Sequence, residues 1–221
     1  FPFPEIAERV ISTYYVSGGI SPNTSYKVVP VFSTCSKRNL IELTICANFA
    51  FVWLSKEGHH NPVSINYLEK VRLPHLFSFV GAMLAGVDCI TMGAGLPLWV
   101  PAVLDSFSQG KAVAQHFPVE SHIPGDNFVM SFNPCEFFKQ ARMEMKRPNF
   151  LPIVSSDSLA SIFLHKASGS VEGFVVELPT AGGHNAPPRG KYLLSEKNEP
   201  IYSSRDEVNF QRIADLGLPF W

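Results

Sequence analysis

A glutamate, two adjacent glycines and a histidine follow one apolar segment of the chain. Residues 173–176 form a run of glycine, aromatic and β-branched residues, which is typical of a buried parallel strand. Glu177 continues the segment, and Gly182, Gly183 and His184 close the loop behind it. Glycines lack a Cβ, so the backbone here can approach a flat or anionic ligand, beside which a histidine can act as a base or an electrostatic partner. A plain turn with a solvated histidine explains the same residues about equally well.

Short apolar segments alternate with helical patterns of about ten residues along most of the chain. The predicted strands are residues 26–32, 63–67, 87–93, 112–119, 150–155 and 173–178, and residues 218–221 begin another. The predicted helices are residues 5–15, 37–57, 73–85, 98–107, 136–145, one that begins at Ser156 or Asp157, and 207–216. Such alternation indicates βαβ units and a parallel sheet.

The fold class predicted from this alternation is α/β, of the (β/α)8 TIM-barrel type. A complete barrel needs eight strands and about 250 residues, and this chain has 221. We therefore expect an incomplete barrel with about strands 2–6 and the start of strand 7. We expect a single domain over residues 1–221, with an irregular lead-in over residues 1–34.

The apolar helix predicted over residues 37–57 stands out. Ser36 is its expected N-cap and Gly58 its stop. Because nearly every face is apolar, the helix must be buried or lie in an interface. In the second case the protein would be a homo-oligomer. A strand over residues 49–54 is the alternative. His59 and His60 follow, and two neighbouring loop histidines are more often solvated than metal ligands.

The composition and net charge indicate a globular protein and bear on its possible partners and compartment. Hydrophobic residues make up 46% of the chain and charged residues 17%, which favours a buried core over disorder. The net charge of −1 gives no electrostatic reason to expect nucleic acid or an acidic membrane as a partner. Cys35, Cys46, Cys89 and Cys135 show no metal-site spacing, so free thiols in a reducing, cytoplasmic compartment are expected. No signal peptide and no membrane-spanning apolar run is evident.

Three segments of the sequence, taken together, resemble the nitronate monooxygenases, also called 2-nitropropane dioxygenases. The first is the stretch from residue 175 to residue 190, VVELPTAGGHNAPPRG. The others are PVSINYLEK at residues 62–70, and GAMLAGVD running into MGAGLP over residues 81–97. The AGGH motif alone is moderately specific, and the three blocks in this order are much more so.

The resemblance implies an FMN-dependent (β/α)8 barrel, a flavoprotein that oxidises alkyl nitronates with O2 to carbonyl compounds and nitrite. The expected partners are therefore a small nitronate substrate and O2. Related FMN-dependent enoyl-thioester reductases, some associated with polyketide synthesis, share the barrel and the loop but reduce a double bond. A non-catalytic fragment is the third alternative.

The resemblance also assigns roles to individual residues. His184 matches the active-site histidine beside the flavin and substrate. The cofactor-binding residues that it implies are Asn66, Ser155, Glu177, Ala181, Gly182 and Gly183. Structural alternatives remain for three of them: Asn66 as a turn cap, Ser155 as a helix cap, and Glu177 as an ion-pair partner of Arg189 or Lys191.

Parts of the family pattern have no counterpart in the sequence. The family's first strand would precede Phe1, and its phosphate-binding loops would follow strands seven and eight. We therefore expect the flavin-ring and substrate side of a site without its phosphate side. The 221-residue chain alone is expected to bind FMN poorly and to be inactive.

Overall fold

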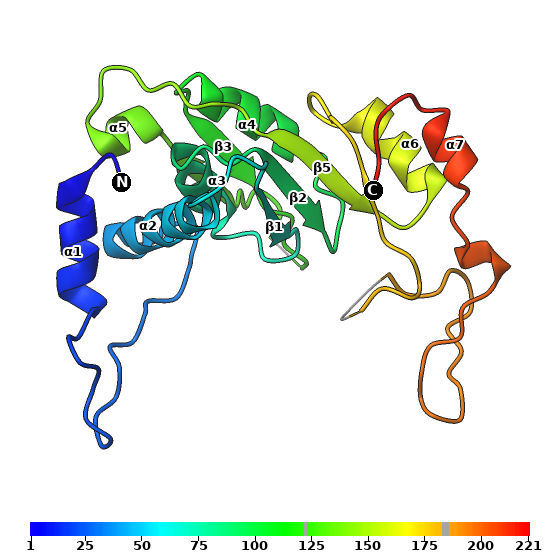
Figure 1. Ribbon diagram of the computed structural model, residues 1–221, viewed down its shortest axis with the longest axis horizontal. Coiled ribbons are helices and arrows are strands. Elements are labelled where there is room, and N and C mark those ends of the chain that lie inside the picture. Colours follow the sequence, from blue (N-terminus) through cyan, green and yellow to red (C-terminus); the bar gives the residue numbers. More distant parts are fainter. Residues whose placement is uncertain (122, 183–185) are drawn as a thin grey trace. The chain divides into compact units, whose positions relative to one another are not determined.

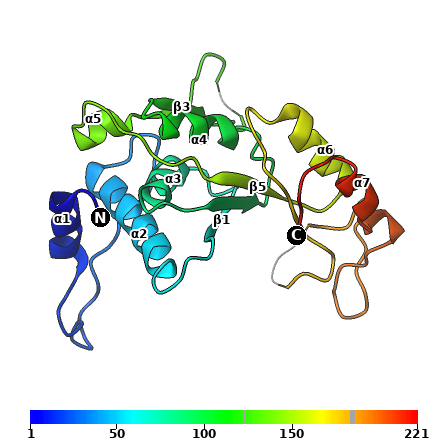
Figure 2. The ribbon, with the colours of Figure 1, turned by 45° about the horizontal axis from the view of Figure 1, so that its top comes forward.

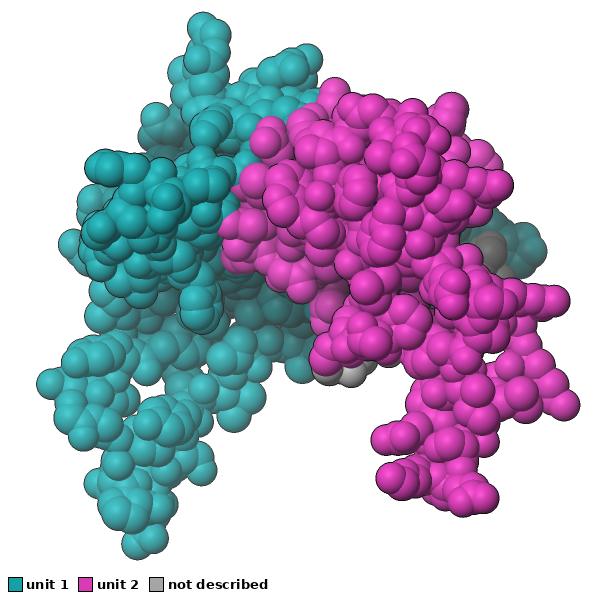
Figure 3. Space-filling view, turned by 45° about the vertical axis from the view of Figure 1, so that its right-hand side comes forward, with its two compact units in different colours: residues 1–63, 71–88, 103–148 teal, residues 64–70, 89–102, 149–221 magenta. Residues whose placement is uncertain are grey.

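The computed structural model describes residues 1–121, 123–182 and 186–221 (Figure 1). The chain divides into two compact units, coloured teal and magenta in Figure 3. Unit 1 comprises Phe1–Val63, Val71–Asp88 and Val103–Pro148, and unit 2 comprises Ser64–Lys70, Cys89–Ala102 and Asn149–Trp221. Helix α4 (Val100–Ser108) begins in unit 2 and continues into unit 1.

Unit 2 is built on a parallel four-stranded sheet, which confirms the predicted α/β class. The strands, in spatial order, are β1 (Ser64–Leu68), β2 (Cys89–Gly93), β5 (Asn149–Val154) and β6 (Val175–Val176). In the register of these strands, Asn66 lies opposite Thr91, and Ile153 lies opposite Val175. Each strand adds to the same side of the sheet as the chain proceeds, so all the carboxyl ends lie along one edge.

The segment predicted to begin a strand at residues 218–221 pairs with the chain next to β6. Phe220 forms a parallel bridge with Phe174. The Trp221 N–H donates to the Phe174 carbonyl at 3.1 Å, and the Val176 N–H donates to the Trp221 carbonyl at 2.7 Å. The sheet thus continues beyond β6 in chain order.

Two helices belong to unit 2, and side-chain caps set where each begins. Helix α6 (Asp157–Lys166) starts at Ser156, whose hydroxyl accepts the Leu159 N–H at 3.1 Å. Helix α7 (Phe210–Ala214) starts later than predicted because Asn209 caps it by accepting the Arg212 N–H. A short 3₁₀ turn, η1 (Ser204–Asp206), precedes α7.

Unit 1 is mainly helical. Its elements are α1 (Pro4–Tyr14), α2 (Arg38–Ser55), α3 (His75–Leu84), α5 (Pro134–Phe138), β3 (Val113–His116) and β4 (Val129–Phe132). Helices α2 and α3 lie side by side (Figures 1 and 2). Gly81 permits the contact, because a Cβ there would lie 2.4 Å from the Ile45 carbonyl oxygen.

The predicted strand over residues 112–119 does not belong to the parallel sheet. It forms β3, which pairs antiparallel with β4 in a separate hairpin, with Val113 opposite Phe132. The loop containing Pro124 and Gly125 turns the chain back on itself, so no helical crossover follows β3. The strand count that made residues 173–178 sixth of eight is therefore wrong, and β6 is fourth along the sheet.

Other local predictions were also wrong. Residues 26–32 form no strand, and Val28 and Val31 are 85% and 90% exposed. Ser36 does not cap α2, because its hydroxyl donates to the Ser33 carbonyl instead. The helix predicted over residues 136–145 ends at Phe138, where Lys139 adopts a left-handed φ of 54°.

Helix α2 confirms the helical prediction over the strand alternative for residues 49–54. It is neither wholly buried nor wholly exposed: Leu40 and Ile45 lie in the core, whereas Phe51 is 70% exposed. In the part of the chain that the structure describes, no helix is both long and apolar enough to span a membrane.

Candidate functional site

A cavity of about 600 Å³ opens at the carboxyl ends of the parallel strands. All of its lining residues belong to unit 2. They are Asn66, Leu68, Lys70, Gly93, Ala94, Gly95, Ile153, Ser155, Leu159, Glu177, Gly182, Ala186 and Pro187. Parallel α/β sheets bind their ligands at this edge, and the volume is within the usual range for small-molecule and cofactor sites.

Strand β1 contributes alternate residues to the cavity. Asn66 and Leu68 line it, as expected for a strand that points every second side chain to one face, and Lys70 lines it from the turn that follows the strand. The Thr91 hydroxyl, on the neighbouring strand, lies 3.1 Å from the Asn66 side-chain oxygen and donates to it. This bond orients the amide and leaves its NH2 group as a donor. Asn66 lies within a strand, so it does not cap a turn.

The turn after β2 forms a second wall. Ala94 has a φ of 56°, which is uncommon for a residue other than glycine and is found most often where function imposes it. A Cβ on Gly95 would lie 2.3 Å from the Glu69 carboxylate, so glycine is needed there. Glu69 is 4% exposed and lies behind this turn.

Strands β5 and β6 contribute Ser155 and Glu177. Ser155 lines the cavity, and the adjacent Ser156 caps the next helix. Glu177 accepts the Ala186 N–H through Oε2 at 3.2 Å. Among the described residues, Glu177 forms no ion pair with Arg189 or Lys191, so its structural contact is the main-chain hydrogen bond to Ala186 instead of the ion pair considered from the sequence.

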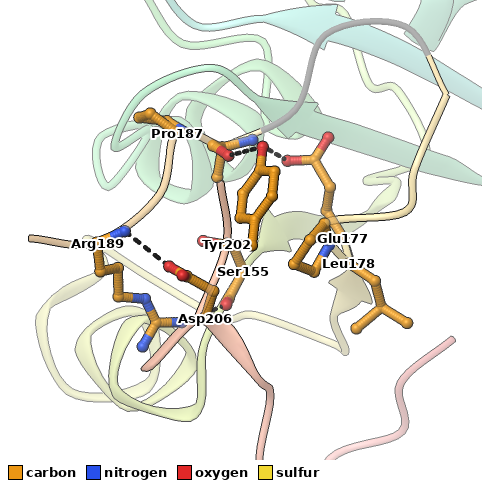
Figure 4. Close-up of a pocket in the computed structure, with 9 residues that line it drawn as sticks. Ser155, Glu177, Leu178, Pro187, Arg189, Tyr202 and Asp206 are labelled. Atoms are coloured by element: carbon orange, nitrogen blue, oxygen red, sulfur yellow. Dashed lines mark hydrogen bonds between the residues drawn. The ribbon is translucent and has the colours of Figure 1, made fainter. Parts of the chain in front are cut away.

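The segment over residues 186–206 is fastened beside the cavity by side chains (Figure 4). Arg189 donates from Nη2 to the Ser155 carbonyl at 2.6 Å, and its main-chain N–H donates to Asp206 Oδ1 at 2.7 Å. The Tyr202 hydroxyl donates to the Ala186 carbonyl at 3.0 Å. The main-chain N–H groups of Arg189 and Ser203 hold the pKa of Asp206 below its usual value. We call these contacts the Arg189 clasp.

The structure brings together most of the described residues that the sequence had singled out. Asn66, Ser155, Glu177 and Gly182 all line the cavity. Ala181 is not among the lining residues, and its N–H closes a turn with the Leu178 carbonyl at 2.9 Å. Gly183 and His184 lie outside the described residues.

Several residues at the cavity were missed from the sequence. Lys70 lies in the turn that follows β1, beyond the predicted strand, so strand alternation did not place it at the cavity. Thr91 and Asp206 act through pairings between segments distant in the chain, for which the local sequence holds no signal.

The cavity can bind a small, partly polar molecule. Its polar groups are an oriented amide, a hydroxyl, an ammonium and a carboxylate, from Asn66, Ser155, Lys70 and Glu177. In the described part of the chain, no cluster of three or more histidine, cysteine or acidic side chains is arranged to hold a metal ion. No protein-family model, no curated protein and no solved structure matches the chain, so family membership is not shown.

Proposed function

We propose that this chain is the central part of an FMN-dependent (β/α)8 barrel and acts as an oxidoreductase of the nitronate monooxygenase type. The observation that carries the proposal is the convergence of Asn66, Ser155, Glu177 and Gly182 on one cavity at the carboxyl ends of the strands. Asn66 belongs to one block of the resemblance, Glu177 and Gly182 belong to another, and Ser155 lies outside the three blocks; the resemblance associates all four with one flavin.

The strand order supports a barrel over a doubly wound sheet. A doubly wound sheet reverses its strand order at a switch point, whereas this sheet grows in one direction from β1 through β6 to Phe220. Chain-order growth is what a barrel requires.

The cavity suits the ring portion of FMN. Among the described residues other than its chain neighbours, none has a heavy atom within 4 Å of the place where a Cβ on Gly182 would stand, which is compatible with a flat ring beside this glycine. The Asn66 NH2 group remains available as a donor to a ring heteroatom. The phosphate-binding loops that the resemblance implies are not assigned to any residue of this chain.

Bound FMN would supply the electron acceptor that the nitronate oxidation needs. The chain's own residues would orient and enclose the reactants. Asn66 would hold one ring edge, and the Arg189 clasp would fix the segment that carries Glu177's partner, Ala186.

Flavin binding tests the cofactor directly. The chain should be expressed together with any coding sequence that continues it at either end, reconstituted with FMN and examined by visible spectroscopy. We expect flavin absorbance and nitrite release from propyl-1-nitronate under air. An absence of flavin bands after reconstitution would refute the proposal, and NAD(P)H consumption with an enoyl thioester but no nitrite would favour the reductase alternative.

His184→Ala tests the residue to which the resemblance gives the catalytic role. The variant should keep its flavin spectrum and lose about 100-fold or more in nitronate turnover, the usual contribution of a general acid or base. Unchanged turnover would remove His184 from this role.

A further inference from the structure

Lys70 is the only lysine or arginine among the residues that line the cavity. It stands directly beyond β1, two and four positions after Leu68 and Asn66, which line the same wall. Residues 69 and 70 form a turn at the end of β1, and this turn places Lys70 in the lining of the same cavity as Asn66.

The Lys70 side chain is available to a ligand. It is exposed, and within residues 1–121, 123–182 and 186–221 no carboxylate forms an ion pair with it. Glu177, the acidic residue of the lining, uses Oε2 to accept the Ala186 N–H. The Glu69 carboxylate is buried against the Gly95 turn and, in the described part of the chain, forms no ion pair with Lys70.

Two donor groups of the cavity are suited to the oxygen atoms of an anionic ligand. The Asn66 NH2 group is left as a donor once Thr91 has occupied its oxygen, and the Lys70 ammonium carries three donors and no acceptor. A ligand with negatively charged oxygens can accept from both, whereas a cation would face the ammonium.

We propose that Lys70 binds the anionic oxygens of the ligand that occupies this cavity. The inference deepens the proposed function and rests on it for the identity of the anion, which is either the nitronate substrate or the phosphate of FMN. Both present oxygen atoms bearing negative charge, and a lysine binds such groups as a point charge.

Paired ligands that differ in charge test the proposal. The protein, expressed with any coding sequence that continues it at either end and isotopically labelled, is titrated with propyl-1-nitronate and with neutral 1-nitropropane, and separately with FMN and with riboflavin, and binding is followed by NMR shifts. Lys70→Gln removes the charge and Lys70→Arg retains it. Lys166→Gln, at the end of α6 and outside the cavity lining, is the control.

We expect Lys70→Gln to weaken binding of one anionic ligand about tenfold or more, because a hydrogen bond to a charged group contributes roughly 1.5–3 kcal/mol. Its neutral counterpart should bind unchanged, Lys70→Arg should restore most of the affinity, and Lys166→Gln should behave as the parent. Loss for nitronate alone assigns the anion as substrate, and loss for FMN alone assigns it as phosphate.

Equal affinity of the parent and Lys70→Gln for both anions overturns the inference, as does a parent that binds neither. The proposed function is decided separately by the flavin spectrum. Flavin bands with no dependence on Lys70 leave the proposed function standing without this inference. If nitronate binding depends on Lys70 but the reconstituted protein shows no flavin bands, the inference about Lys70 stands and the proposed function does not.

Discussion

The two compact units use their polar side chains in opposite ways. In unit 1, Glu42 is 3% exposed and is held by Arg9 and Arg38, with distances of 2.6 Å and 2.9 Å to Oε1. Burial alone would raise its pKa, but the two arginines outweigh burial and lower it. In unit 2, the side chains of Asn66 and Lys70 are exposed in a cavity and keep free donor groups.

The aromatic cluster of unit 1 also contrasts with the strand-end loop of unit 2. The rings of Phe77, Phe107 and Phe137 surround Phe132 in unit 1 with centroid distances of 5.2–6.1 Å. Unit 2 instead leaves open space at Gly182. Charged and apolar groups in unit 1 therefore stabilise the fold, whereas groups at the strand ends of unit 2 are available to a ligand.

The largest effect should come from the aromatic cluster of unit 1. Phe132→Ala removes a side chain that is 5% exposed and leaves a cavity among three rings, so the free energy of unfolding should fall by about 3–5 kcal/mol. Phe51→Ala, at a site 70% exposed, is the matched control and should change it by less than about 0.5 kcal/mol. Urea unfolding measures both, and similar values for the two variants would contradict the assigned core.

Two glycine substitutions compare the units directly. Gly81→Ala would push a Cβ to 2.4 Å from the Ile45 carbonyl oxygen, so α2 and α3 must separate, at a cost of about 1–3 kcal/mol. In the part of the chain that the structure describes, a Cβ on Gly182 meets no atom within 4 Å beyond its chain neighbours, so Gly182→Ala should leave stability within about 0.5 kcal/mol of the parent. The cavity variant should instead weaken flavin binding. A Gly182→Ala variant less stable than Gly81→Ala would reverse the comparison.

The contribution of Asp88 to the free energy of unfolding is expected to depend on pH. The Asp88 carboxylate accepts hydrogen bonds from Lys56 Nζ at 2.5 Å, from the Val63 N–H at 3.0 Å and from Lys146 Nζ at 3.0 Å. These bonds, of which the one from Lys56 has the largest effect, hold the pKa of Asp88 well below its usual value. The stabilisation is therefore complete above the unfolded-state pKa, about 3.9, and is lost as pH falls below it.

Asp88→Asn should accordingly lower the free energy of unfolding by about 1–2 kcal/mol near neutral pH. The difference from the parent should shrink near pH 3, where the unfolded chain takes up the proton. Unfolding in urea at both pH values provides the measurement. A difference that does not change with pH would show that the carboxylate charge is not what stabilises this region.

The sequence predicted best the structure that depends on local pattern. The periodicity of apolar residues placed β1, β2, β5, α2 and α3 to within a few residues, because each buries one face or is apolar throughout. It failed for β3, since an alternating strand looks the same whether its partner runs parallel or antiparallel. The Arg189 clasp was also missed, because Arg189 reaches Ser155 across 34 positions and no local pattern specifies that contact.

Removing the side-chain bond of the Arg189 clasp should have the smallest effect on global stability. Its effect on local opening of the clasped segment should be larger. Arg189→Ala removes the bond to the Ser155 carbonyl but keeps the main-chain N–H donor to Asp206, so the free energy of global unfolding should fall by less than about 1 kcal/mol. Residues 186–206 should open more often, and cleavage there by a dilute protease should be several-fold faster. Lys197→Ala, at an exposed turn of the same segment, is the matched control and should be cleaved at the parent's rate. Equal cleavage of all three proteins would show that the arginine does not hold this segment against the strand ends. The comparison between the buried ion pair of unit 1 and the exposed polar groups of unit 2 would then depend on the cavity residues alone.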